Sequence, residues 1–461
     1  MKFTVQLVAW TDNGQEETRQ EVAVLEKESE RGEHLGLTLA EAKQLLKRLQ
    51  HSLVERQTTS YLVARARCEA CGRALLVKEQ LTRTIRTLFG TVVLSSPRLY
   101  HCRCRARTAT TFRPLRALLP DSTTPELLFL ETKWASLISY GLTARVLKDF
   151  LPLDETLTAT TVQNHTLAIA QRCEEELGEE QQEAVDGCPG DPGPSSRPKG
   201  PVAVGLDGGY VRDWEQKQRH FEVIVGKSLP PAGPVKCFGF VQTYDTNPQQ
   251  RLCAVLQSPG VPDPQSLTFL SDGGETVRDL PMALSPRATH LLDWFHLAMR
   301  VTVLGQYSKG VIRLNQEVGE VVQKKLESVK WSLWHGKVDK TLARLRVLAL
   351  LIDHFADSYP RFAQLKKAVQ EFHTYIVNNR RFIPNYGRRY RRGERISTGF
   401  VESTVNSVIS KRFVKRQSMQ WTKRGAHLLL QTRVKTLNNE LASTFRRWYP
   451  ALQVEDAALA A

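Results

Sequence analysis

Two carboxylates in this 461-residue chain each follow a short apolar run and precede two glycines. The segment PVAVGLDGG starts at Pro201 and contains Asp207, and the segment SLTFLSDGG starts at Ser266 and contains Asp272. Each pattern predicts a buried strand that delivers a carboxylate to a sheet edge, with bare glycine backbone beside it. Neighbouring carboxylates repel, so a fold keeps them together only around a cation or a proton. Carboxylate, water and phosphate oxygens are the ligands that Mg²⁺ prefers, and paired ions of this kind serve phosphoryl transfer.

A third carboxylate, Glu402, lies near the start of a predicted helix that runs from about Gly399 to Asn438. Glu402 and Asn406 are one helical turn apart, beside the stripe of apolar residues that is expected to be buried. We therefore predict Glu402 as the third metal ligand and Asn406 as a residue that contacts the ligands. The alternative is an ordinary acidic residue near a helix N-terminus, where the helix dipole favours it.

A further apolar run, residues 288–292, ends at Asp293, and His296 follows three residues later. Asp293 is an alternative to Asp272 as the second metal-binding carboxylate. We expect Asp272 to fill that role, because it ends a clean strand, whereas Asp293 lies where a helix begins and can cap it. His296 is expected to support the ligands or to contact the substrate, and a packed core histidine is the alternative.

Four of the eight cysteines form two close pairs, Cys68 with Cys71 and Cys102 with Cys104, separated by strand-like sequence. Two such pairs are typical of a tetrahedral zinc site that closes a small β unit. The second pair has one intervening residue instead of two, and His101 is a possible replacement for one sulfur. Reduced free thiols or a redox Cys-x-x-Cys remain the alternatives.

The formal net charge of +16 indicates a polyanionic partner, with nucleic acid as the first candidate. Arginine neutralises phosphate, and a tyrosine beside it can stack on an unpaired base. Tyr386 and Tyr390 lie within the densest run of basic residues, 379–395. The residues that we predict to contact DNA are Arg380, Arg381, Arg388, Arg389, Arg391, Arg392, Lys411 and Arg412.

A helix-turn-helix pattern covers residues 142–151 and 158–167. The second helix opens with Thr161, Gln163, Asn164 and His165, in the place where a recognition helix presents side chains to bases. A plain helical hairpin is the alternative.

The elements that must position these residues follow from apolar periodicity and from turn residues. We predict a hairpin, helices before and after the cysteine pairs, a Pro/Gly linker, five strands, a long all-helical stretch and the helix that carries Glu402. The corresponding ranges are 3–10 with 20–26, 38–60, 124–175, 187–200, 201–207, 221–226, 235–241, 266–271, 288–292, 300–378 and 399–438.

The order of these features resembles that of DDE transposases with an RNase H-like core. It is most similar to bacterial insertion-sequence transposases of the ISKra type and more distantly to Mutator-related elements. Asp293-Trp-Phe-His296 matches the Cys/Asp-x-x-His motif of these families. The resemblance implies that Asp207, Asp272 and Glu402 bind Mg²⁺ or Mn²⁺ for cleavage at transposon ends and for strand transfer to target DNA.

The expected fold is a multidomain α+β protein with a zinc-bound β unit, a helix-turn-helix, and an RNase H-like α/β core that carries an all-α insertion. In chain order these parts are 1–60 (hairpin and helix), 61–110 (zinc unit), 111–180 (helix-turn-helix region), 181–200 (linker), 201–300 (first part of the core), 301–395 (insertion with a basic end) and 396–461 (Glu-bearing helix and tail).

Double-stranded DNA, both as terminal repeats and as target, is the expected partner, and the family implies a homo-oligomer, expected as a dimer. No apolar run approaches the roughly 18 residues of a membrane span, so a cytoplasmic, nucleoid-associated protein is expected. Two other functions stay open. One is a structure-specific nuclease of the same fold, and the other is a non-catalytic DNA-binding protein derived from a transposase.

Overall fold

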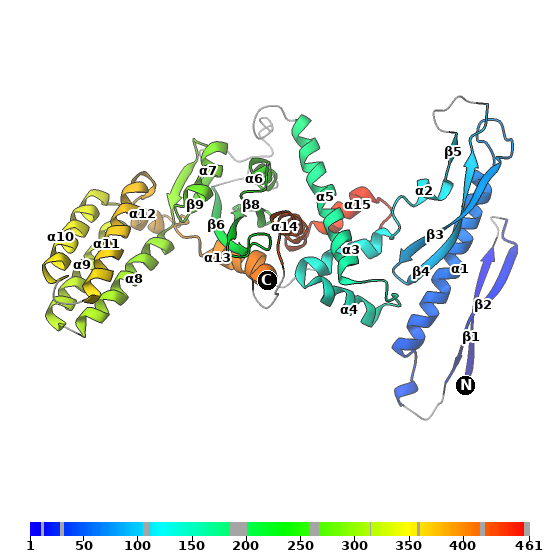
Figure 1. Cartoon of the computed structure of the whole chain (residues 1–461), viewed down its shortest axis with the longest axis horizontal. Helices are drawn as coiled ribbons and strands as arrows, with labels where there is room; N and C mark the ends of the chain where they lie inside the picture. The colour runs from blue at the N-terminus through cyan, green and yellow to red at the C-terminus, as the bar shows by residue number, and fades with distance from the viewer. Residues whose placement is uncertain are drawn as a thin grey trace. The chain divides into compact units, whose positions relative to one another are not determined.

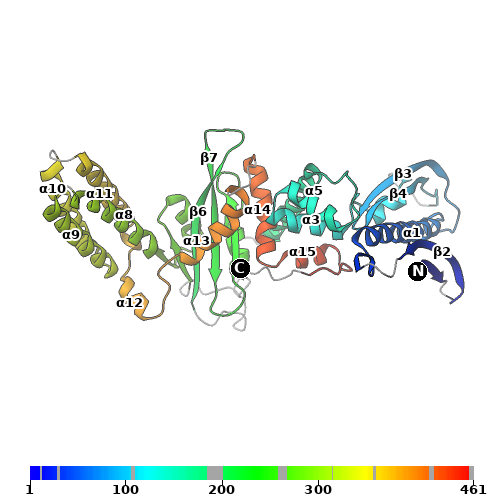
Figure 2. The same ribbon diagram turned by 90° about the horizontal axis from the view of Figure 1, so that it is seen from below.

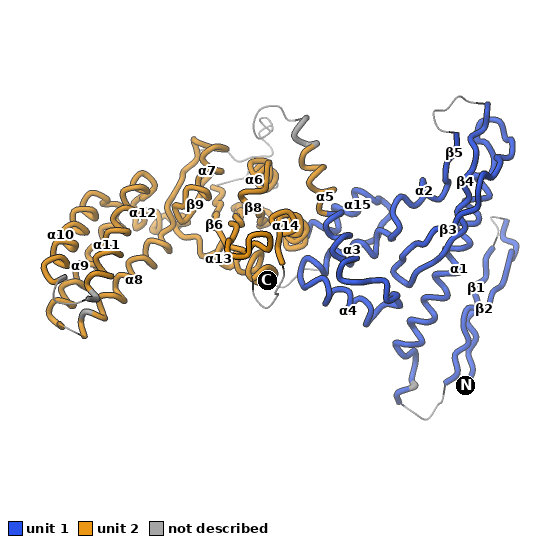
Figure 3. Tube along the Cα trace, viewed as in Figure 1, with its two compact units in different colours: residues 1–169, 439–461 blue, residues 170–438 orange. Residues whose placement is uncertain are grey.

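The computed structural model describes residues 1–10, 13–27, 32–104, 110–183, 201–257, 267–313, 315–356, 360–414 and 420–455. It is a mixed α+β protein with sheets of two, three and five strands (Figure 1). The chain divides into two compact units (Figure 3): unit 1 comprises residues 1–169 and 439–461, and unit 2 comprises residues 170–438. Residues 184–200, which hold the predicted Pro/Gly linker, lie outside the described residues, and so does residue 266.

Unit 1 begins with the predicted hairpin, in which β1 (Lys2–Trp10) pairs antiparallel with β2 (Glu16–Glu26). A short helix, η1 (Gly32–His34), precedes α1 (Leu39–Arg65). Thr38 caps α1, and Glu41 completes a capping box, which satisfies backbone groups at the helix start. The hairpin and this helix were both predicted correctly, although the helix runs five residues further than expected.

The cysteine pairs flank an antiparallel sheet of three strands. These strands are β3 (Val77–Thr87), β4 (Gly90–Tyr100) and β5 (Thr111–Phe112), and α2 (Pro114–Leu118) follows them. Ile85, Val92 and Leu115 form a buried cluster against Tyr61 and Val54 of α1. The long helix therefore covers one face of this sheet.

Unit 1 contains further helical elements. They are α3 (Pro125–Leu137), α4 (Tyr140–Phe150), the start of α5 (Ala159–Glu183) and α15 (Leu441–Trp448). Those other than α4 share one apolar core. Leu441 and Phe445 are fully buried against Leu128, Phe129 and Ile169. Residues 439–461 therefore belong to unit 1, whereas we expected them to be the tail of the core that contains Asp207.

Unit 2 contains the five predicted strands in one sheet. They are β6 (Val202–Arg212), β7 (His220–Leu229), β8 (Lys236–Val241), β9 (Leu267–Ser271) and β10 (Thr289–Leu292). Their order is β10-β9-β6-β7-β8. The pairs β10–β9 and β9–β6 are parallel, and the pairs β6–β7 and β7–β8 are antiparallel.

Helices cover both faces of this sheet. On one face, α6 (Pro248–Gln257) and α7 (Glu275–Leu284) contribute Leu252 and Val277 to a core with Val204 and Phe269. On the other face lie α13 (Gly399–Val405), the π-helix η4 (Asn406–Val414) and α14 (Lys423–Leu437). Figure 2 shows α13 lying across β6 and β7. The single helix predicted from Gly399 to Asn438 is thus divided into separate elements.

The strand that carries Asp207 continues through Gly208 and Gly209 to Arg212. The prediction that it ends at Asp207 is therefore wrong. These glycines lie in the strand, where Gly209 pairs with Val223. A Cβ atom on Gly205 would lie 2.1 Å from Cγ2 of Val401, and one on Gly209 would lie 2.7 Å from Cδ1 of Ile409. Glycines at these two positions therefore allow α13, which bears Glu402, and η4 to approach the sheet closely.

The predicted all-helical stretch follows β10. It comprises α8 (Trp294–Ile312), α9 (Gln316–Trp334), α10 (Val338–Ala356), α11 (Pro360–Asn378), η3 (Arg380–Phe382) and α12 (Tyr386–Arg391). Fully buried side chains such as Val322, Leu345, Leu365 and Ile376 give these helices a core of their own. This stretch is the helical insertion of unit 2.

Candidate metal centres and nucleic-acid interface

Asp207 lies on β6, and Asp272 directly follows the adjacent parallel strand β9. The two strands pair as far as Gly205 and Leu270, and each carboxylate comes two residues later. One ligand atom from each of Asp207, Asp272 and His296 lies within 4.8 Å of the other two, and all three side chains are partly buried. The two carboxylates therefore meet as the sequence predicted, and the geometry of the group is suited to a metal ion.

The surroundings of Asp207 disfavour its ionised form. The pKa of Asp207 is raised to about 6, chiefly by burial and to a lesser extent by the charges of Asp272 and Glu402. The backbone N–H of Gly208, which donates to Oδ1 over 2.8 Å, and the nearby His296 act in the opposite direction. A nearby cation would stabilise the ionised form of such a carboxyl group.

The helical insertion holds the loop that follows Asp272. The hydroxyl of Tyr375 donates a 2.5 Å hydrogen bond to the backbone carbonyl of Asp272, while the N–H of Gly274 donates to Oδ1 of Asp272 over 2.9 Å. Gly273 has φ = +85°, and a Cβ atom there would lie 2.7 Å from Oδ1 of Asn379. Only glycine therefore suits this turn on both backbone and steric grounds.

Asp293 is completely buried, with 0% of its surface exposed, and both of its oxygens have partners. Oδ1 accepts the backbone N–H groups of Phe295 (2.9 Å) and Thr398 (3.0 Å). Oδ2 accepts the hydroxyl of Thr398 and is bonded to Nδ1 of His296 over 2.6 Å. Burial alone would raise the pKa of Asp293, but hydrogen bonds from His296 and Thr398 lower it on balance. Asp293 caps α8, as expected, and Asp272 is the carboxylate grouped with Asp207.

The imidazole of His296 is positioned by Asp293. This hydrogen bond raises the pKa of His296 above its ordinary value, and the charges of Asp207 and Asp272 add to the effect. The sequence placed His296 near the site but not within the metal-binding group. The Asp-x-x-His spacing at a helix start was the signal for its position, since residues three apart share one face of a helix.

Glu402 faces the same site from α13. Its side chain is partly buried, and its charge contributes to the raised pKa of Asp207. It is not part of the compact group formed by Asp207, Asp272 and His296. Asn406 is exposed at the end of α13, and its backbone N–H donates to the carbonyl of Glu402 at the point where the π-helix begins.

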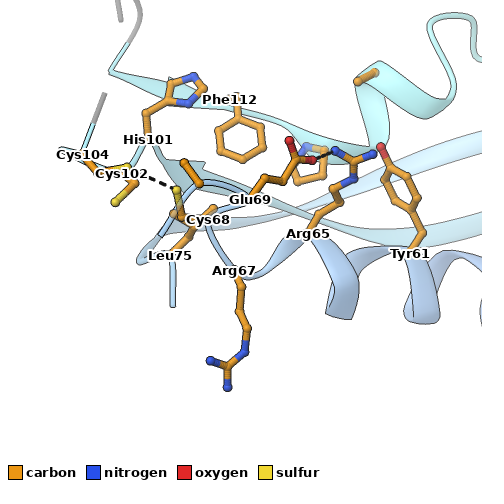
Figure 4. Close-up of a pocket in the computed structure, with 13 residues that line it drawn as sticks. Tyr61, Arg65, Arg67, Cys68, Glu69, Leu75, His101, Cys102, Cys104 and Phe112 are labelled. Carbon is orange, nitrogen blue, oxygen red and sulfur yellow. Dashed lines mark hydrogen bonds and ion pairs between the residues drawn. The ribbon is translucent and has the colours of Figure 1, made fainter. Parts of the chain in front are cut away.

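The four paired cysteines of unit 1 converge on one point (Figure 4). The Sγ atoms of Cys68 and Cys104 are 3.5 Å apart, and those of Cys71 and Cys102 are 3.4 Å apart. Zn–S bonds of about 2.3 Å in a tetrahedron place sulfur atoms roughly 3.8 Å apart. The observed spacing therefore fits a tetrahedral metal site with four sulfur ligands.

The turn between Cys68 and Cys71 also suits a metal-binding knuckle. The N–H of Cys68 donates to the carbonyl of Arg73 over 2.8 Å, and Gly72 has φ = +71°. Backbone N–H groups of Ala70 and Cys71 lower the pKa of the Cys68 thiol to about 6, which favours a thiolate. His101 stacks on Phe112 with ring centroids 4.5 Å apart and lies outside this ligand group. A cavity of about 230 Å³ borders the cluster.

The predicted DNA-contacting residues are placed in two different ways. Arg381, Arg388, Arg391, Arg392 and Lys411 are exposed, and Arg380, also exposed, pairs with Asp339 over 2.9 Å. Arg389 is partly buried and pairs with Glu394 over 2.6 Å.

The prediction for Arg412 needs correction. Its side chain is fully buried, and the guanidinium lies over the ring of Trp421, so Arg412 has no surface to offer to DNA. Tyr386 is likewise buried and donates its hydroxyl to the carbonyl of Leu292 over 2.8 Å. Tyr390, by contrast, is 66% exposed, so a tyrosine for stacking remains beside the arginines.

The two helices predicted as a helix-turn-helix are present as α4 and the first part of α5. His165, however, is bonded through Nδ1 to the fully buried carboxylate of Glu131 over 2.6 Å. It therefore helps to pack unit 1 and is not a base-contacting side chain at this surface, contrary to our expectation. Of the other predicted base-contacting residues, Asn164 is exposed, and Thr161 and Gln163 are partly buried.

Among the described residues, no helix is both long enough and apolar enough to cross a membrane. No family model matches the chain, and none of the curated proteins is significantly similar to it. The functional groups of unit 2 are thus the main evidence for the chemistry of the protein. It combines a compact Asp–Asp–His group, a third carboxylate on an opposing helix and exposed arginines in the same unit.

Proposed function

We propose that the protein is an RNase H-like DDE transposase that cleaves DNA at transposon ends and joins the ends to target DNA. The observation that carries this proposal is the meeting of Asp207, on β6, with Asp272, which directly follows the adjacent parallel strand β9, and with Glu402 near them on α13. The raised pKa of Asp207 supports it, because a carboxylate group of this kind gains stability from a bound cation.

The sheet of unit 2 supports the assignment of the core. Three consecutive antiparallel strands are followed by two strands added in parallel on the side of the first strand, which is the arrangement expected of an RNase H-like core. The helical insertion enters after the last strand and before the helix with Glu402, as in the families that the sequence resembles. Asp207 is on the central strand of the sheet.

In this proposal, Asp207, Asp272 and Glu402 hold Mg²⁺ or Mn²⁺. A bound ion of this class polarises the phosphodiester and lowers the pKa of an attacking water. The carboxylates of the chain fix the position of the scissile phosphate against the nucleophile, which is water in the first step and the released 3′-hydroxyl in the second. Tyr375 and Gly273 keep the Asp272 loop in place for both displacements.

The remaining elements supply binding to double-stranded DNA. The cysteine cluster holds a structural Zn²⁺ ion, because four sulfur atoms at this spacing are a zinc ligand set. Arg388, Arg391 and Arg392 in unit 2 are exposed for phosphate contacts, and Tyr390 lies among them. We propose that a homodimer brings two transposon ends together.

The test uses the full-length protein with DNA that carries the terminal repeats found by sequencing the DNA on either side of its gene. With Mg²⁺ or Mn²⁺, the wild type should nick at the repeat ends, and Asp207→Asn should bind the same DNA without nicking it. Asp279→Asn, an exposed change on α7, is the matched control and should cleave normally. Identical products from wild type and Asp207→Asn would refute the catalytic assignment.

Two further outcomes separate the alternatives. Cleavage of branched DNA or RNA–DNA hybrids in preference to repeat ends would indicate a structure-specific nuclease. Binding of repeat ends without any cleavage by the wild type, with either metal, would indicate a non-catalytic DNA-binding protein.

A further inference from the structure

We propose that Nε2 of His296 binds the catalytic metal ion directly and that Asp293 holds the imidazole in place for it. The inference rests on the proposed function and deepens it, because it adds a nitrogen ligand to a site expected to consist of carboxylates alone. It also assigns the site to a class of metal ion.

The position of the imidazole is the first argument. A ligand atom of His296 lies within 4.8 Å of ligand atoms of both Asp207 and Asp272. Around a divalent cation with bonds of about 2.1 Å, neighbouring ligands lie about 3 Å apart and opposite ones about 4.2 Å apart. The 4.8 Å limit is close to these spacings, so one cation can reach ligand atoms from all three side chains.

The hydrogen bonding of the ring is the second argument. Nδ1 is bonded to the buried carboxylate of Asp293 over 2.6 Å, which leaves Nε2 as the nitrogen that can bind a cation. Metal-binding histidines commonly donate their other N–H to a carboxylate, which fixes the ring and makes it a better ligand. Asp293, His296 and the two site carboxylates form this arrangement.

The rigidity of Asp293 is the third argument. Besides His296, it accepts two backbone N–H groups, from Phe295 and Thr398, and the hydroxyl of Thr398. Thr398 directly precedes α13, which carries Glu402, and Phe295 is in the first turn of α8, which carries His296. One buried carboxylate therefore ties together the starts of the two helices that face the site.

The consequence concerns which ion the site prefers. Mg²⁺ favours oxygen ligands, whereas imidazole nitrogen favours transition metals. A site with the three proposed carboxylates and one imidazole should therefore bind Mn²⁺ more tightly than Mg²⁺. Replacement of His296 should narrow this difference, because only the nitrogen contribution is removed.

Pulsed electron paramagnetic resonance of the full-length protein with bound Mn²⁺ tests the ligation without reference to activity. The wild type should show coupling between Mn²⁺ and a ¹⁴N nucleus, and the ¹⁵N pattern should replace it after histidine labelling. His296→Gln should lose the coupling and bind Mn²⁺ at least tenfold more weakly. His354→Gln, an exposed change on α10, should keep both properties. Circular dichroism and the unfolding temperature establish that each variant is folded.

Three results would contradict parts of the proposal. If Mn²⁺ binds and Asp207→Asn removes it, but no nitrogen coupling appears, His296 is not a ligand and the proposed function still stands. Coupling that persists in folded His296→Gln would show that another nitrogen is bound, which also overturns the inference. If no Mn²⁺ binds, or if Asp207→Asn leaves its binding unchanged, the metal site fails and the proposed function fails with it.

Discussion

Replacement of Asp207 by asparagine should stabilise the metal-free protein while it removes metal binding. The wild-type carboxylate lies in a partly buried place beside the charges of Asp272 and Glu402. Asparagine has nearly the same shape but no charge, so it removes both the repulsion and most of the cost of burial. A residue that is kept at a cost in stability is the expected mark of a functional site.

The magnitude and its dependence on pH follow from the pKa of Asp207, which rises from the ordinary value of 3.8 to about 6. The folded state therefore binds a proton more tightly than the unfolded chain does. Stability is then highest below about pH 4, falls as the pH rises towards 6 and is constant above that range. A shift of this size corresponds to about 3 kcal/mol at most. Because the carboxylate is only partly buried, we expect about 1.5–2 kcal/mol.

Urea unfolding with a chelator present, from pH 4 to pH 8, measures this effect. The midpoints of wild type and Asp207→Asn should nearly coincide at pH 4 and separate by pH 7, with the variant more stable. Addition of Mn²⁺ should then raise the wild-type midpoint and leave that of Asp207→Asn unchanged. Asp279→Asn should follow the wild type throughout.

A metal-free Asp207→Asn that is no more stable than the wild type at pH 8 would refute the reasoning. A stability difference that is the same at pH 4 and pH 8 would also contradict it, because the effect would then not arise from ionisation of Asp207.

Three further changes test other parts of the structure. Gly205→Ala should destabilise unit 2 by about 1–3 kcal/mol in thermal unfolding, because the added Cβ would lie 2.1 Å from Cγ2 of Val401. The matched control is Gly305→Ala, where the added Cβ would have no atom within 4 Å. This control should stabilise α8 by about 0.5–1 kcal/mol in the same experiment. Tyr375→Phe removes the hydrogen bond to the Asp272 carbonyl, so the free energy of unfolding should fall by about 1 kcal/mol in the same experiment. The same change should weaken Mn²⁺ binding in calorimetric titration. Unchanged Mn²⁺ affinity would show that this hydrogen bond does not position the site. Wild type should carry one zinc ion per chain by elemental analysis and Cys71→Ser should lose it, so a zinc-free wild type would contradict the zinc assignment.

The strands of unit 2 could be predicted because their signals are local. Three apolar runs in the sequence mark the strands β6, β9 and β10, and they end at Asp207, Asp272 and Asp293. The continuation of β6 through Gly208 and Gly209 could not be predicted, because glycine does not favour strands. This part of β6 pairs with β7, and Gly209 also lies close to Ile409, which is two hundred residues further along the chain.

Only the part of the candidate site that depends on local sequence patterns could be predicted. The pairing of Asp207 with Asp272 follows from two similar strands, but the inclusion of His296 depends on how α8 leaves the sheet and on its bond to Asp293. Arg412 was misplaced because a basic residue beside a basic run is usually exposed, and its position over Trp421 depends on tertiary packing. Tertiary contacts of this kind leave no local pattern to read.

The return of the chain to unit 1 bears on its synthesis in the cell. Leu441 and Phe445 complete a core whose other members, such as Leu128 and Phe129, leave the ribosome some three hundred residues earlier. The first helices to be made must therefore wait, with apolar surface uncovered, until unit 2 has been translated. A polypeptide cut off anywhere between Ala170 and Asn439 would keep that surface open and be recognisable to chaperones and proteases. Only a chain translated beyond α15 can thus present a finished core in unit 1, so the fold depends on translation at least to this point.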